Sequence, residues 1–421
     1  MSSVFEWFSL RGFIDQCTSD ELYAILDQST PFYFGIDPTA KSPHLGNWVG
    51  IIACMKLQQF GHKPIILVGG ATGLIGDPSG KDLERPLLSP QEIQSNVESL
   101  TEILKKFLDF SNPSTAPVIV NNYDWFSKMN VIEFLRDVGK QFRLGPMLGK
   151  ESVKNRLNSE EGMSFTEFSY QILQGYDFYY LSEKYGARLQ IGGSDQYGNI
   201  TAGIDLTRRL AKKSVYGLTF PLLVRSDGKK FGKSEKGAIW LKSELCSPFE
   251  MYQYLVRVSD KDVIMMLKML TLLEMDIIIE IECEMMSSPN FAQKTLAREV
   301  TKLVHGETGL QDALIVSAAL EPGKTNFQLG DLNAAAENMP HIEISADEVL
   351  GKSYVDVVLK SGLLSSKNEV RRLVQNHGAY LNGKKISDSS FLITKDFLLN
   401  GNLCLISAGK KNSMLIILKF E

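Results

Sequence analysis

A change of pattern near residue 248 constrains the fold of this 421-residue chain more than any other feature. Before it, short apolar segments alternate with longer segments in which apolar residues recur at helical spacing. After a helical lead-in over 1–30, we expect strands at 31–36, 63–68 and 188–192, and helices from His44, over 89–107, 131–143 and 165–185, and from Asp195. Strands that alternate with helices predict a parallel sheet with helices on both faces.

Beyond residue 248 the pattern is helical only, with Leu, Met and Ile at helical spacing. A segment rich in Pro, Gly, Asn and acidic residues follows and predicts a linker. The residues after this segment are expected to form a compact module that contains both helices and strands. We therefore expect an α/β domain at 1–247, an all-helical domain at 248–320, a linker at 321–351 and a small α+β module at 352–421.

Charge is unevenly distributed along the chain. The formal net charge is −4, which argues against a surface that coats nucleic acid uniformly. Residues 351–421 hold 11 Lys and Arg against 5 Asp and Glu, a net charge of +6, and residues 1–350 hold 34 against 44, a net charge of −10. An acidic body with a basic terminal module predicts a confined contact with a polyanion.

The cysteines and apolar segments bear on the cellular compartment. The five cysteines are odd in number, scattered and without a CxxC pair: Cys17, Cys54, Cys246, Cys283 and Cys404. We expect neither a zinc site nor a disulfide framework, and a reducing cytoplasm fits best. The first thirty residues are acidic and lack an apolar run, so no secretory signal is predicted. Four charged residues interrupt the longest apolar stretch, 263–281, so no membrane span is predicted.

Residues 37–47, with the sequence DPTAKSPHLGN, leave a strand and enter a helix. A helix N-terminus at the carboxyl edge of a parallel sheet favours anions. Thr39 and His44 can each donate a hydrogen bond to a phosphate, and Gly46 allows a base or sugar to approach the backbone. The alternative is an ordinary strand-to-helix turn in which His44 caps the helix.

Residues 69–81, with the sequence GGATGLIGDPSGK, match neither a P-loop nor the GxGxxG fingerprint. The glycines at 70, 73 and 76 predict close backbone packing, with Asp77 presented at the edge of the sheet. Lys81 and Arg85 lie beyond it. A purely structural turn is the alternative interpretation.

Two lysines mark the segment 227–234, with the sequence DGKKFGKS. Lys230 and Lys233 are three residues apart, separated by a glycine and followed by the hydroxyl of Ser234. Ammonium groups on such a loop can stabilise developing phosphate charge. An exposed lysine-rich loop without a role in catalysis is the alternative.

The helix expected over 165–185 carries Tyr170, Gln174 and Asp177 at positions i, i+4 and i+7, and hence on one face. Three polar groups on one stripe of an apolar helix suit a pocket for a zwitterion with a polar tip. A solvated stripe is the alternative, and the apolar and aromatic residues beside it weaken that interpretation.

Taken in order, the first and third segments resemble the HIGH and KMSKS signatures of class I aminoacyl-tRNA synthetases. Four segments, 33–39, 69–80, 170–177 and 192–200, further resemble the bacterial tyrosyl-tRNA synthetase family, and the resemblance runs from end to end. It implies a Rossmann-like, parallel-sheet nucleotide-binding catalytic domain, an anticodon-side helical domain and a small α+β RNA-binding module. The implied partners are tRNA(Tyr), L-tyrosine and ATP with Mg²⁺ as substrates, with no protein-ligated metal. A homodimer through helices near 124–160 is also implied.

Site residues follow from the resemblance. The substrate amino group is assigned to Asp77, Tyr170 and Gln174, the phenolic hydroxyl to Tyr33 and Asp177, and the carboxylate to the vicinity of Gln196. The phosphates are assigned to Thr39 and His44, surrounded by the cations Lys81, Arg85, Lys230 and Lys233. The remaining ATP contacts are assigned to Asp37, Gly46, Asn47, Asp195 and Ser234. No side chain needs to act as a covalent nucleophile, because positioning and charge stabilisation supply the rate.

The sequence departs from the family pattern at three positions. Asn47 replaces the final histidine of HIGH, Phe34 stands where a cysteine commonly touches the ribose, and Gly232 replaces the serine of KMSKS. The segment 44–50, HLGNWVG, also resembles tryptophanyl-tRNA synthetases, although these lack the GGSDQ run and the basic terminal module. Two further alternatives are a catalytically inactive RNA-binding paralogue and a nucleotidyltransferase of the same superfamily.

The terminal module carries its positive charge in two places. Lys367, Arg371 and Arg372 recur at helical spacing, while Lys384 and Lys385 follow a turn at residues 382–383. A basic helix beside a basic turn is typical of contacts with a phosphate backbone. A solvated charged helix is the alternative. The pattern also resembles the small RNA-binding module named after ribosomal small-subunit protein four, which favours tRNA contact.

Overall fold

The computed structural model describes residues 3–79, 86–160, 162–234, 237–319, 339–409 and 412–420. Contacts between residues divide the chain into two compact units. The first unit comprises Met1–Leu245 and Ser259–Ala292, and the second comprises Cys246–Val258 and Gln293–Glu421. Each described helix is too short or too polar to cross a membrane.

A six-stranded sheet of described residues forms the centre of the first unit, with the strand order β1-β6-β5-β2-β3-β4. β1 is antiparallel to β6, and the remaining neighbours are parallel, which confirms the predicted sheet. The strands are β1 Gln16–Cys17, β2 Phe32–Ile36, β3 Pro64–Val68, β4 Val118–Asn121, β5 Leu189–Gly193 and β6 Tyr216–Phe220. The three strands predicted from the sequence are β2, β3 and β5, and the other three were not predicted.

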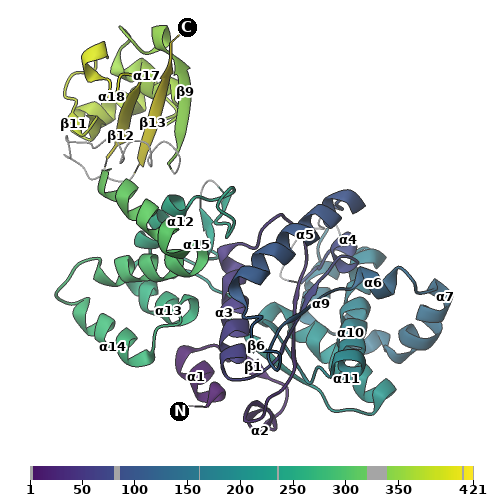
Figure 1. The fold of residues 1–421 in the computed structure, drawn as a ribbon. Coiled ribbons are helices and arrows are strands. Elements are labelled where there is room, and N and C mark those ends of the chain that lie inside the picture. The colour runs from purple at the N-terminus through teal and green to yellow at the C-terminus, as the bar shows by residue number, and fades with distance from the viewer. Residues whose placement is uncertain are drawn as a thin grey trace. The chain divides into compact units, whose positions relative to one another are not determined.

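The helices of the first unit surround this sheet (Figure 1). The helix predicted over 165–185 has those bounds, whereas 131–143 is a broken run of α-, π- and 3₁₀-helix. The elements are α1 Val4–Arg11, α2 Leu22–Leu26, α3 Leu45–Gln59, α4 Thr72–Ile75, α5 Pro90–Phe107, α6 Tyr123–Phe126, α7 Val131–Glu133, η1 Phe134–Val138, η2 Gly139–Gln141, α8 Leu144–Leu148, α9 Glu151–Leu157, α10 Phe165–Tyr185, η3 Ser194–Gln196 and α11 Tyr197–Ala211. Serine caps with a glutamate three residues later begin both α5 and α10, because the two side chains satisfy each other's backbone N–H groups.

Neighbouring residues of β2 show which helix covers which face of the sheet. Tyr33 packs against Phe178 of α10, with ring centroids 5.9 Å apart. Phe34 points the other way, and its ring lies so close to Gly50 of α3 that a Cβ there would be 2.5 Å away. Thus α3, which follows β2, and α10, which precedes β5, cover opposite faces of the sheet, and the strand order runs one way from β2 through β3 to β4 and the opposite way from β5 to β6. Ligands of such sheets bind in the crevice at this point, beyond the carboxyl ends of the strands.

The helical region after residue 248 is divided between the two units. Two of its helices, α13 Asp260–Leu270 and α14 Met275–Glu284, belong to the first unit. The helix α12 Pro248–Val256 and all but the first two residues of α15 Phe291–Ala319 belong to the second. Gly306 interrupts α15 with a φ of 77°.

The terminal module contains a second sheet, whose described strands have the order β11-β10-β12-β13-β9. Its elements are β9 His341–Ser345, η4 Ala346–Glu348, α17 Tyr354–Lys360, α18 Lys367–Gln375, β10 Ala379–Leu381, β11 Lys384–Lys385, η5 Lys395–Phe397, β12 Leu403–Ala408 and β13 Asn412–Lys419. β9 lies inside 321–351, where the sequence predicted a linker, and residues 321–338 lie outside the described ranges. β9 pairs in parallel with β13 and buries Ile344, so the sheet begins before residue 352.

Candidate active site

Polar residues gather at the carboxyl ends of four parallel strands. Asp37 follows β2, the glycine-rich segment 69–77 follows β3, Asn122 follows β4 and the segment 194–196 follows β5. Since these ends meet at one edge of the sheet, residues distant in sequence become neighbours. The predicted residues Asp37, Asp77, Asp195 and Gln196 lie at this edge.

The glycine-rich segment is packed as closely as its sequence predicted. A Cβ on Gly69 would lie 2.1 Å from Oδ1 of Asp37 and 2.2 Å from Oγ1 of Thr72, and a Cβ on Gly70 would lie 2.3 Å from Oδ1 of Asn121. A side chain at either position would displace a polar group of the site. Glycine is therefore required here by the approach of side chains from β2 and β4.

Asp177 of α10 and Tyr33 of β2 form a buried polar pair. Asp177 is 1% exposed, and its two carboxylate oxygens accept hydrogen bonds from Trp125 Nε1 and Asn122 Nδ2, each at 3.0 Å. Burial raises the pKa of Asp177 well above its usual value, although both donors act to lower it. Burial and the carboxylates of Asp177 and Asp37 raise the pKa of Tyr33, so its phenol stays protonated.

Asp37 is hydrogen-bonded to Tyr170, which the resemblance assigned to the amino group of the substrate, and to Thr72. Its Oδ2 accepts a hydrogen bond from the Tyr170 hydroxyl at 2.8 Å, and its Oδ1 accepts one from Thr72 Oγ1 at 2.7 Å. Asn122 Nδ2 lies 3.0 Å from the same Thr72 oxygen. Because Asn122 also bonds to Asp177, one chain of polar contacts joins Tyr170 to the buried carboxylate.

A second chain of hydrogen bonds joins the residues assigned to the amino and carboxylate groups of the substrate. Gln196 Nε2 donates to Asp77 Oδ2 at 2.8 Å, and Gln174 Nε2 donates to Gln196 Oε1 at 3.1 Å. Asn199 Nδ2 donates to Gln174 Oε1 at 2.9 Å. Burial and Asp77 raise the pKa of Asp195, whereas Lys230 acts to lower it. The structure thus brings Asp77, Gln174, Gln196 and Asp195 together.

His44 caps α3, as expected for the ordinary strand-to-helix turn that was the alternative interpretation of residues 37–47. Its Nδ1 accepts a hydrogen bond from the Gly46 N–H at 3.0 Å, and its own N–H donates to Asn47 Oδ1 at 3.0 Å. Thr39 is exposed in the preceding turn, where its N–H donates to the Asp37 carbonyl at 2.9 Å. The cap fixes the imidazole at a helix N-terminus, where the helix dipole favours anions.

The lysine segment lies against this helix start. Gly232 has a φ of 85°, and a Cβ there would be 2.9 Å from the Gly46 nitrogen. The Leu45 N–H donates to the Ile239 carbonyl at 2.7 Å, which continues the contact. Lys230 and Lys233 are exposed. The two segments that resemble the class I signatures therefore adjoin.

Lys81 and Arg85 lie outside the described residues. Ser234 belongs to β7 Lys233–Ser234, which pairs with β8 Gly237–Ala238. Within the described ranges, no three His, Cys, Asp or Glu side chains are grouped so that they could hold a metal ion.

Several polar residues of the site were not predicted from the sequence. They contact the predicted residues and comprise Thr72, Ser79, Asn122, Trp125 and Asn199. A usable signal existed for two of them. Asn122 follows the apolar run of β4, and Asn199 lies three residues after Gln196 on the next helical turn.

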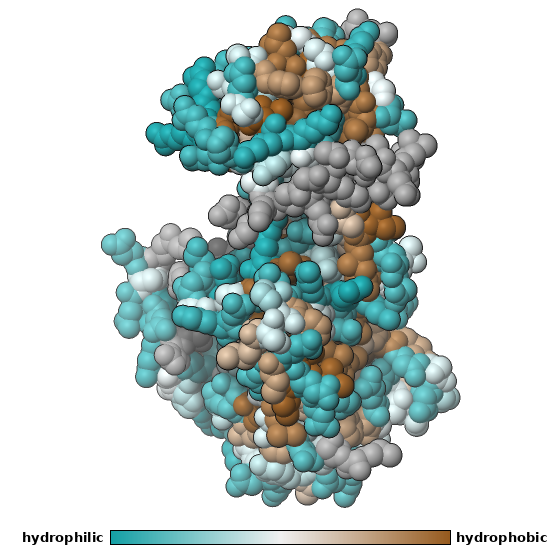
Figure 2. All heavy atoms as spheres, turned by 90° about the vertical axis from the view of Figure 1, so that its left-hand side faces the viewer, coloured by the Kyte–Doolittle hydropathy of each residue, from teal (hydrophilic) through white to brown (hydrophobic). Residues whose placement is uncertain are grey.

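The basic residues of the terminal module are exposed. Helix α18 buries Val370 and Val374, so Lys367, Arg371 and Arg372 remain at the surface, with Lys367 paired to Asp356 at 2.6 Å. On the module's face shown in Figure 2, hydrophilic side chains lie at one side and along the lower rim, and apolar side chains lie in the middle.

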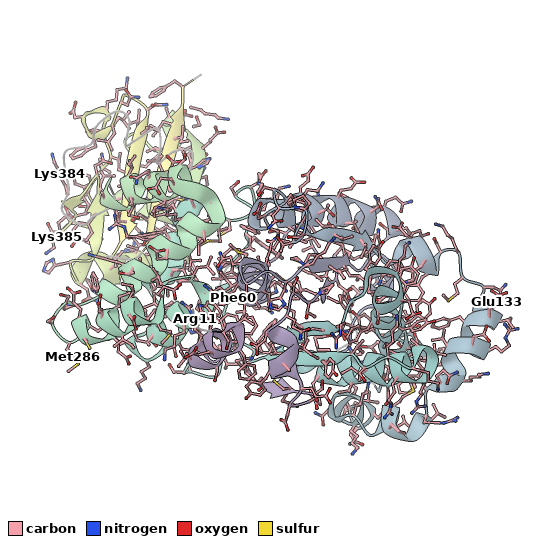
Figure 3. The ribbon with its side chains drawn as sticks, turned by 60° about the horizontal axis from the view of Figure 1, so that its bottom comes forward. Arg11, Phe60, Glu133, Met286, Lys384 and Lys385 are labelled. Carbon is pink, nitrogen blue, oxygen red and sulfur yellow. The ribbon has the colours of Figure 1, made fainter. Side chains whose placement is uncertain are left out.

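The basic turn of the module is a two-residue hairpin. Asn382 and Gly383 join β10 to β11 with φ of 49° and 73°, the positive values that tight hairpin turns require. Lys384 and Lys385 follow at the outer edge of the module (Figure 3).

Comparison with known proteins identifies the family of the chain. The family model described as tRNA synthetases class I (W and Y) matches residues 27–320, and that of the tyrosine--tRNA ligase SYY-like C-terminal domain matches residues 331–416. The fold and the paired signatures thus define a class I aminoacyl-tRNA synthetase.

Individual relatives narrow the class. The tyrosine--tRNA ligase of Protochlamydia amoebophila is 51% identical, and the match covers 100% of both chains. The chloroplastic/mitochondrial tyrosine--tRNA ligase of Arabidopsis thaliana is 46% identical over 96% of this chain and 82% of its own. A solved structure, the C-terminally truncated mitochondrial tyrosyl-tRNA synthetase of Aspergillus nidulans, is 32% identical over 74% of this chain and 92% of its own, with a TM-score of 0.67. The chain belongs to the tyrosyl-tRNA synthetase family.

Proposed function

We propose that the chain activates L-tyrosine with ATP and transfers the tyrosyl group to tRNA(Tyr). In the first step the tyrosine carboxylate attacks the α-phosphate of ATP, supplied with Mg²⁺ as the substrate complex, and pyrophosphate leaves. In the second, the terminal ribose hydroxyl of the tRNA takes the tyrosyl group and AMP leaves. The observation that carries the proposal is the buried pair of Tyr33 and Asp177 on the amino-acid side of the site.

This pair supplies selectivity for a phenol. A tyrosine hydroxyl can donate to the Asp177 carboxylate and accept from the Tyr33 hydroxyl, replacing the bonds it loses with water. Phenylalanine would leave both groups buried and unpaired, which is costly. Tyrosyl-tRNA synthetases are themselves the established example of this effect, with phenylalanine rejected by about 10⁵, a value known for that family and taken from it.

The remaining amino-acid contacts are assigned to the two hydrogen-bond chains. Asp77, Tyr170 and Gln174 offer a carboxylate, a hydroxyl and an amide to the substrate ammonium group, while Gln196 lies beside Asp77 and reaches the substrate carboxylate. Their mutual bonds hold these side chains in place before the substrate arrives. Such preorganisation lowers the cost of orienting the two reactants.

The ATP contacts are assigned to the adjoining signature segments. His44 caps the start of α3, which favours the phosphates, and Thr39 lies in the turn before it. Lys230 and Lys233 stabilise the negative charge that develops as pyrophosphate leaves. Asp195 is assigned to the ribose. Asp37 is assigned between ribose and substrate ammonium, since it bonds to Tyr170. The assignments of Gly46, Asn47 and Ser234 to ATP, and of Lys81 and Arg85 to the phosphates, rest on the family resemblance alone.

The domain roles follow the same division. We assign adenylate formation to residues 1–247, the anticodon side to the helices of 248–320, and tRNA backbone contact to the basic surface of the terminal module. That surface comprises Lys367, Arg371, Arg372, Lys384 and Lys385, all exposed.

A homodimer and a cytoplasmic location complete the proposal. Apolar side chains are exposed over 123–165, a segment that would be covered in a dimer: Tyr123, Val131, Ile132, Leu135, Leu144 and Phe165, the last 76% exposed. Sedimentation of the purified chain tests the dimer, since a monomer at micromolar concentration would contradict it.

The proposed cytoplasmic location rests on the cysteines. Five free, scattered cysteines suit a reducing compartment.

Charging of tRNA tests the proposed function. The purified chain, incubated with ATP, Mg²⁺ and a tRNA(Tyr) transcript, should attach labelled tyrosine to the terminal ribose. Labelled tryptophan with tRNA(Trp) is the matched control and should give no product. Charging with tryptophan in place of tyrosine would support the tryptophanyl alternative, and no charging with either would support the inactive paralogue.

A further inference from the structure

Helix α13 holds the turn that precedes the signature lysines. Asp262, in the first turn of α13, accepts two hydrogen bonds from Ser226, one from its backbone N–H at 2.9 Å and one from its hydroxyl at 3.2 Å. The carboxylate is buried, with 5% of the residue exposed. A buried carboxylate that accepts both an N–H and a hydroxyl from one residue fixes that residue's position and orientation.

Ser226 lies in a short hairpin, residues 223–231, which we call the lysine hairpin. Its two arms are joined by hydrogen bonds from the Phe231 N–H to the Leu223 carbonyl at 2.9 Å and from the Arg225 N–H to the Lys229 carbonyl at 2.8 Å. Gly228 makes the turn with a φ of 80°. So short a hairpin has little core of its own, and its attachment to α13 determines its direction. Lys230 lies in the second arm of the hairpin. Lys233 lies two residues beyond the end of the hairpin at Phe231.

The opposite end of α13 is attached to the helix of the other signature. Trp48, one turn into α3, donates its indole N–H to the Leu270 carbonyl at 3.0 Å. Arg11 Nη1 donates to the carbonyls of Lys268 and Thr271 at 2.7 and 2.8 Å. A cation at a helix C-terminus is stabilising.

Arg11 remains a cation in this position. Burial lowers the pKa of Arg11 to about 10, which still leaves it charged at neutral pH. Arg11 is the last residue of α1, and its side chain reaches the C-terminal end of α13 (Figure 3). α13 is thus held at its C-terminus by α1 and α3, while its N-terminus holds the lysine hairpin.

We infer that Asp262 is a positioning residue for adenylate formation. Through Ser226 it sets where the lysine hairpin presents Lys230 and Lys233 to the phosphates beside His44. This rests on the proposed role of the two lysines. Asp262 does not touch substrate, so its removal changes the placement of the cations and leaves the tyrosine pocket intact.

The first test replaces Asp262 in the full chain. Asp262→Ala should lower kcat for tyrosine-dependent ATP–pyrophosphate exchange about 10- to 100-fold, the cost of a misplacement of about 1 Å. Tyrosine affinity, measured by equilibrium dialysis, should stay within about twofold. Asp262→Asn keeps an oxygen that accepts from the Ser226 N–H and should restore most of the rate. Exchange at the wild-type rate in Asp262→Ala would overturn the inference.

Two control variants separate positioning from stability. Ser259→Ala removes another hydroxyl that bonds to the Asp262 carboxylate, at 2.7 Å, without touching the hairpin. Leu267→Ala removes a fully buried side chain from the same helix and should lower the unfolding temperature at least as much as Asp262→Ala. Both should exchange near the wild-type rate well below their unfolding temperatures. A loss in Leu267→Ala equal to that in Asp262→Ala would show that α13 stability alone matters.

A double variant shows whether Asp262 acts through the lysines. If it does, Asp262→Ala should cost less than threefold once Lys233 is already Ala, because the cation to be positioned is gone. Losses that multiply would overturn the inference. Exchange at the wild-type rate in Lys233→Ala alone would instead contradict the proposed function of the lysines, so the two failures are distinguishable.

Discussion

The site at the end of the six-stranded sheet and the basic surface of the terminal module present polar groups in opposite ways. At the sheet, Asp177, Gln174 and Asn122 are buried; Asp177 accepts a hydrogen bond from Asn122, and Gln174 accepts one from Asn199. On the module, Arg371 and Lys384 are exposed on a helix and a turn. Buried groups in fixed positions discriminate between ligands, whereas exposed cations attract a polyanion through charge, which salt screens. The first arrangement suits recognition of one amino acid and the second suits contact with an RNA backbone.

The largest effect is expected at the signature lysines. Lys233→Ala should lower tyrosine-dependent pyrophosphate exchange about 10²- to 10³-fold, the typical cost of one lost charge contact in a transition state. Tyrosine binding should change less than twofold, because Lys233 is assigned to phosphate. Lys229→Ala, in the adjoining lysine hairpin and also exposed, is the matched control. Wild-type exchange in Lys233→Ala would remove this lysine from the mechanism.

Removal of the terminal module should separate the two steps. Because β9 pairs with β13, the cut belongs before Met339 and not at residue 350, where it would leave one strand of the sheet behind. Charging of tRNA should fall by about 10² or more, while pyrophosphate exchange stays near the wild-type rate, since every described residue assigned to tyrosine and ATP precedes residue 235. Normal charging by the shortened chain would contradict the assigned role of the module.

The next largest effect is expected at the buried pair of Tyr33 and Asp177. Tyr33→Phe should lower the ratio of kcat/KM for tyrosine over phenylalanine about tenfold, because the pocket then has one buried hydroxyl fewer to leave unpaired. Tyr185→Phe, at the end of α10, should leave the ratio unchanged. If the ratio stays the same in Tyr33→Phe as well, Tyr33 lies outside the amino-acid pocket.

Replacing the cations of the basic helix α18 should change how strongly tRNA binding depends on salt concentration. Lys367, Arg371 and Arg372 changed together to Ala should lower charging about tenfold at physiological salt and reduce the salt slope of tRNA binding by as much as about three. Pyrophosphate exchange should not change. The control changes three exposed lysines of the first unit, Lys105, Lys106 and Lys128, to Ala. An unaltered salt slope would identify α18 as a solvated face.

The smallest effect concerns the cap of the same helix. Ser366 accepts a hydrogen bond from the Glu369 N–H at 3.2 Å, and Ser366→Ala should lower the free energy of unfolding of the module by about 1 kcal/mol. Charging at 25 °C should change less than twofold, because the cations of α18 remain. A loss of charging as large as that of the triple variant would mean that helix stability, and not charge, controls the contact.

The sequence predicted those elements whose bounds are determined by a local pattern of residues. The bounds of α10 follow from its apolar periodicity, a serine cap and a terminal glycine, and the glycine-rich segment behaves as its spacing indicated. β9 was missed because its half-exposed pattern, with neighbouring acidic and small residues, resembles a linker. Its identity as a strand depends on β13, about seventy residues later.

Several residues that the sequence assigned to the substrates lie together in the structure, whereas the residues that hold Asp177 in place were not predicted. Asn122 and Trp125 bond to Asp177 across 55 and 52 positions of sequence. No local periodicity records such a bond, because it depends on β4 and α10 meeting at one edge of the sheet. The same holds for Ser226 and Asp262, which are 36 positions apart.

ATP–pyrophosphate exchange by the full chain, with each of the twenty amino acids in turn, decides whether the buried pair selects tyrosine. The site places a buried carboxylate beside a buried phenol, so exchange should depend on tyrosine and exceed that with every other amino acid by at least about 10³. Preference for phenylalanine or tryptophan, or no dependence on any amino acid, would contradict the proposed tyrosine pocket.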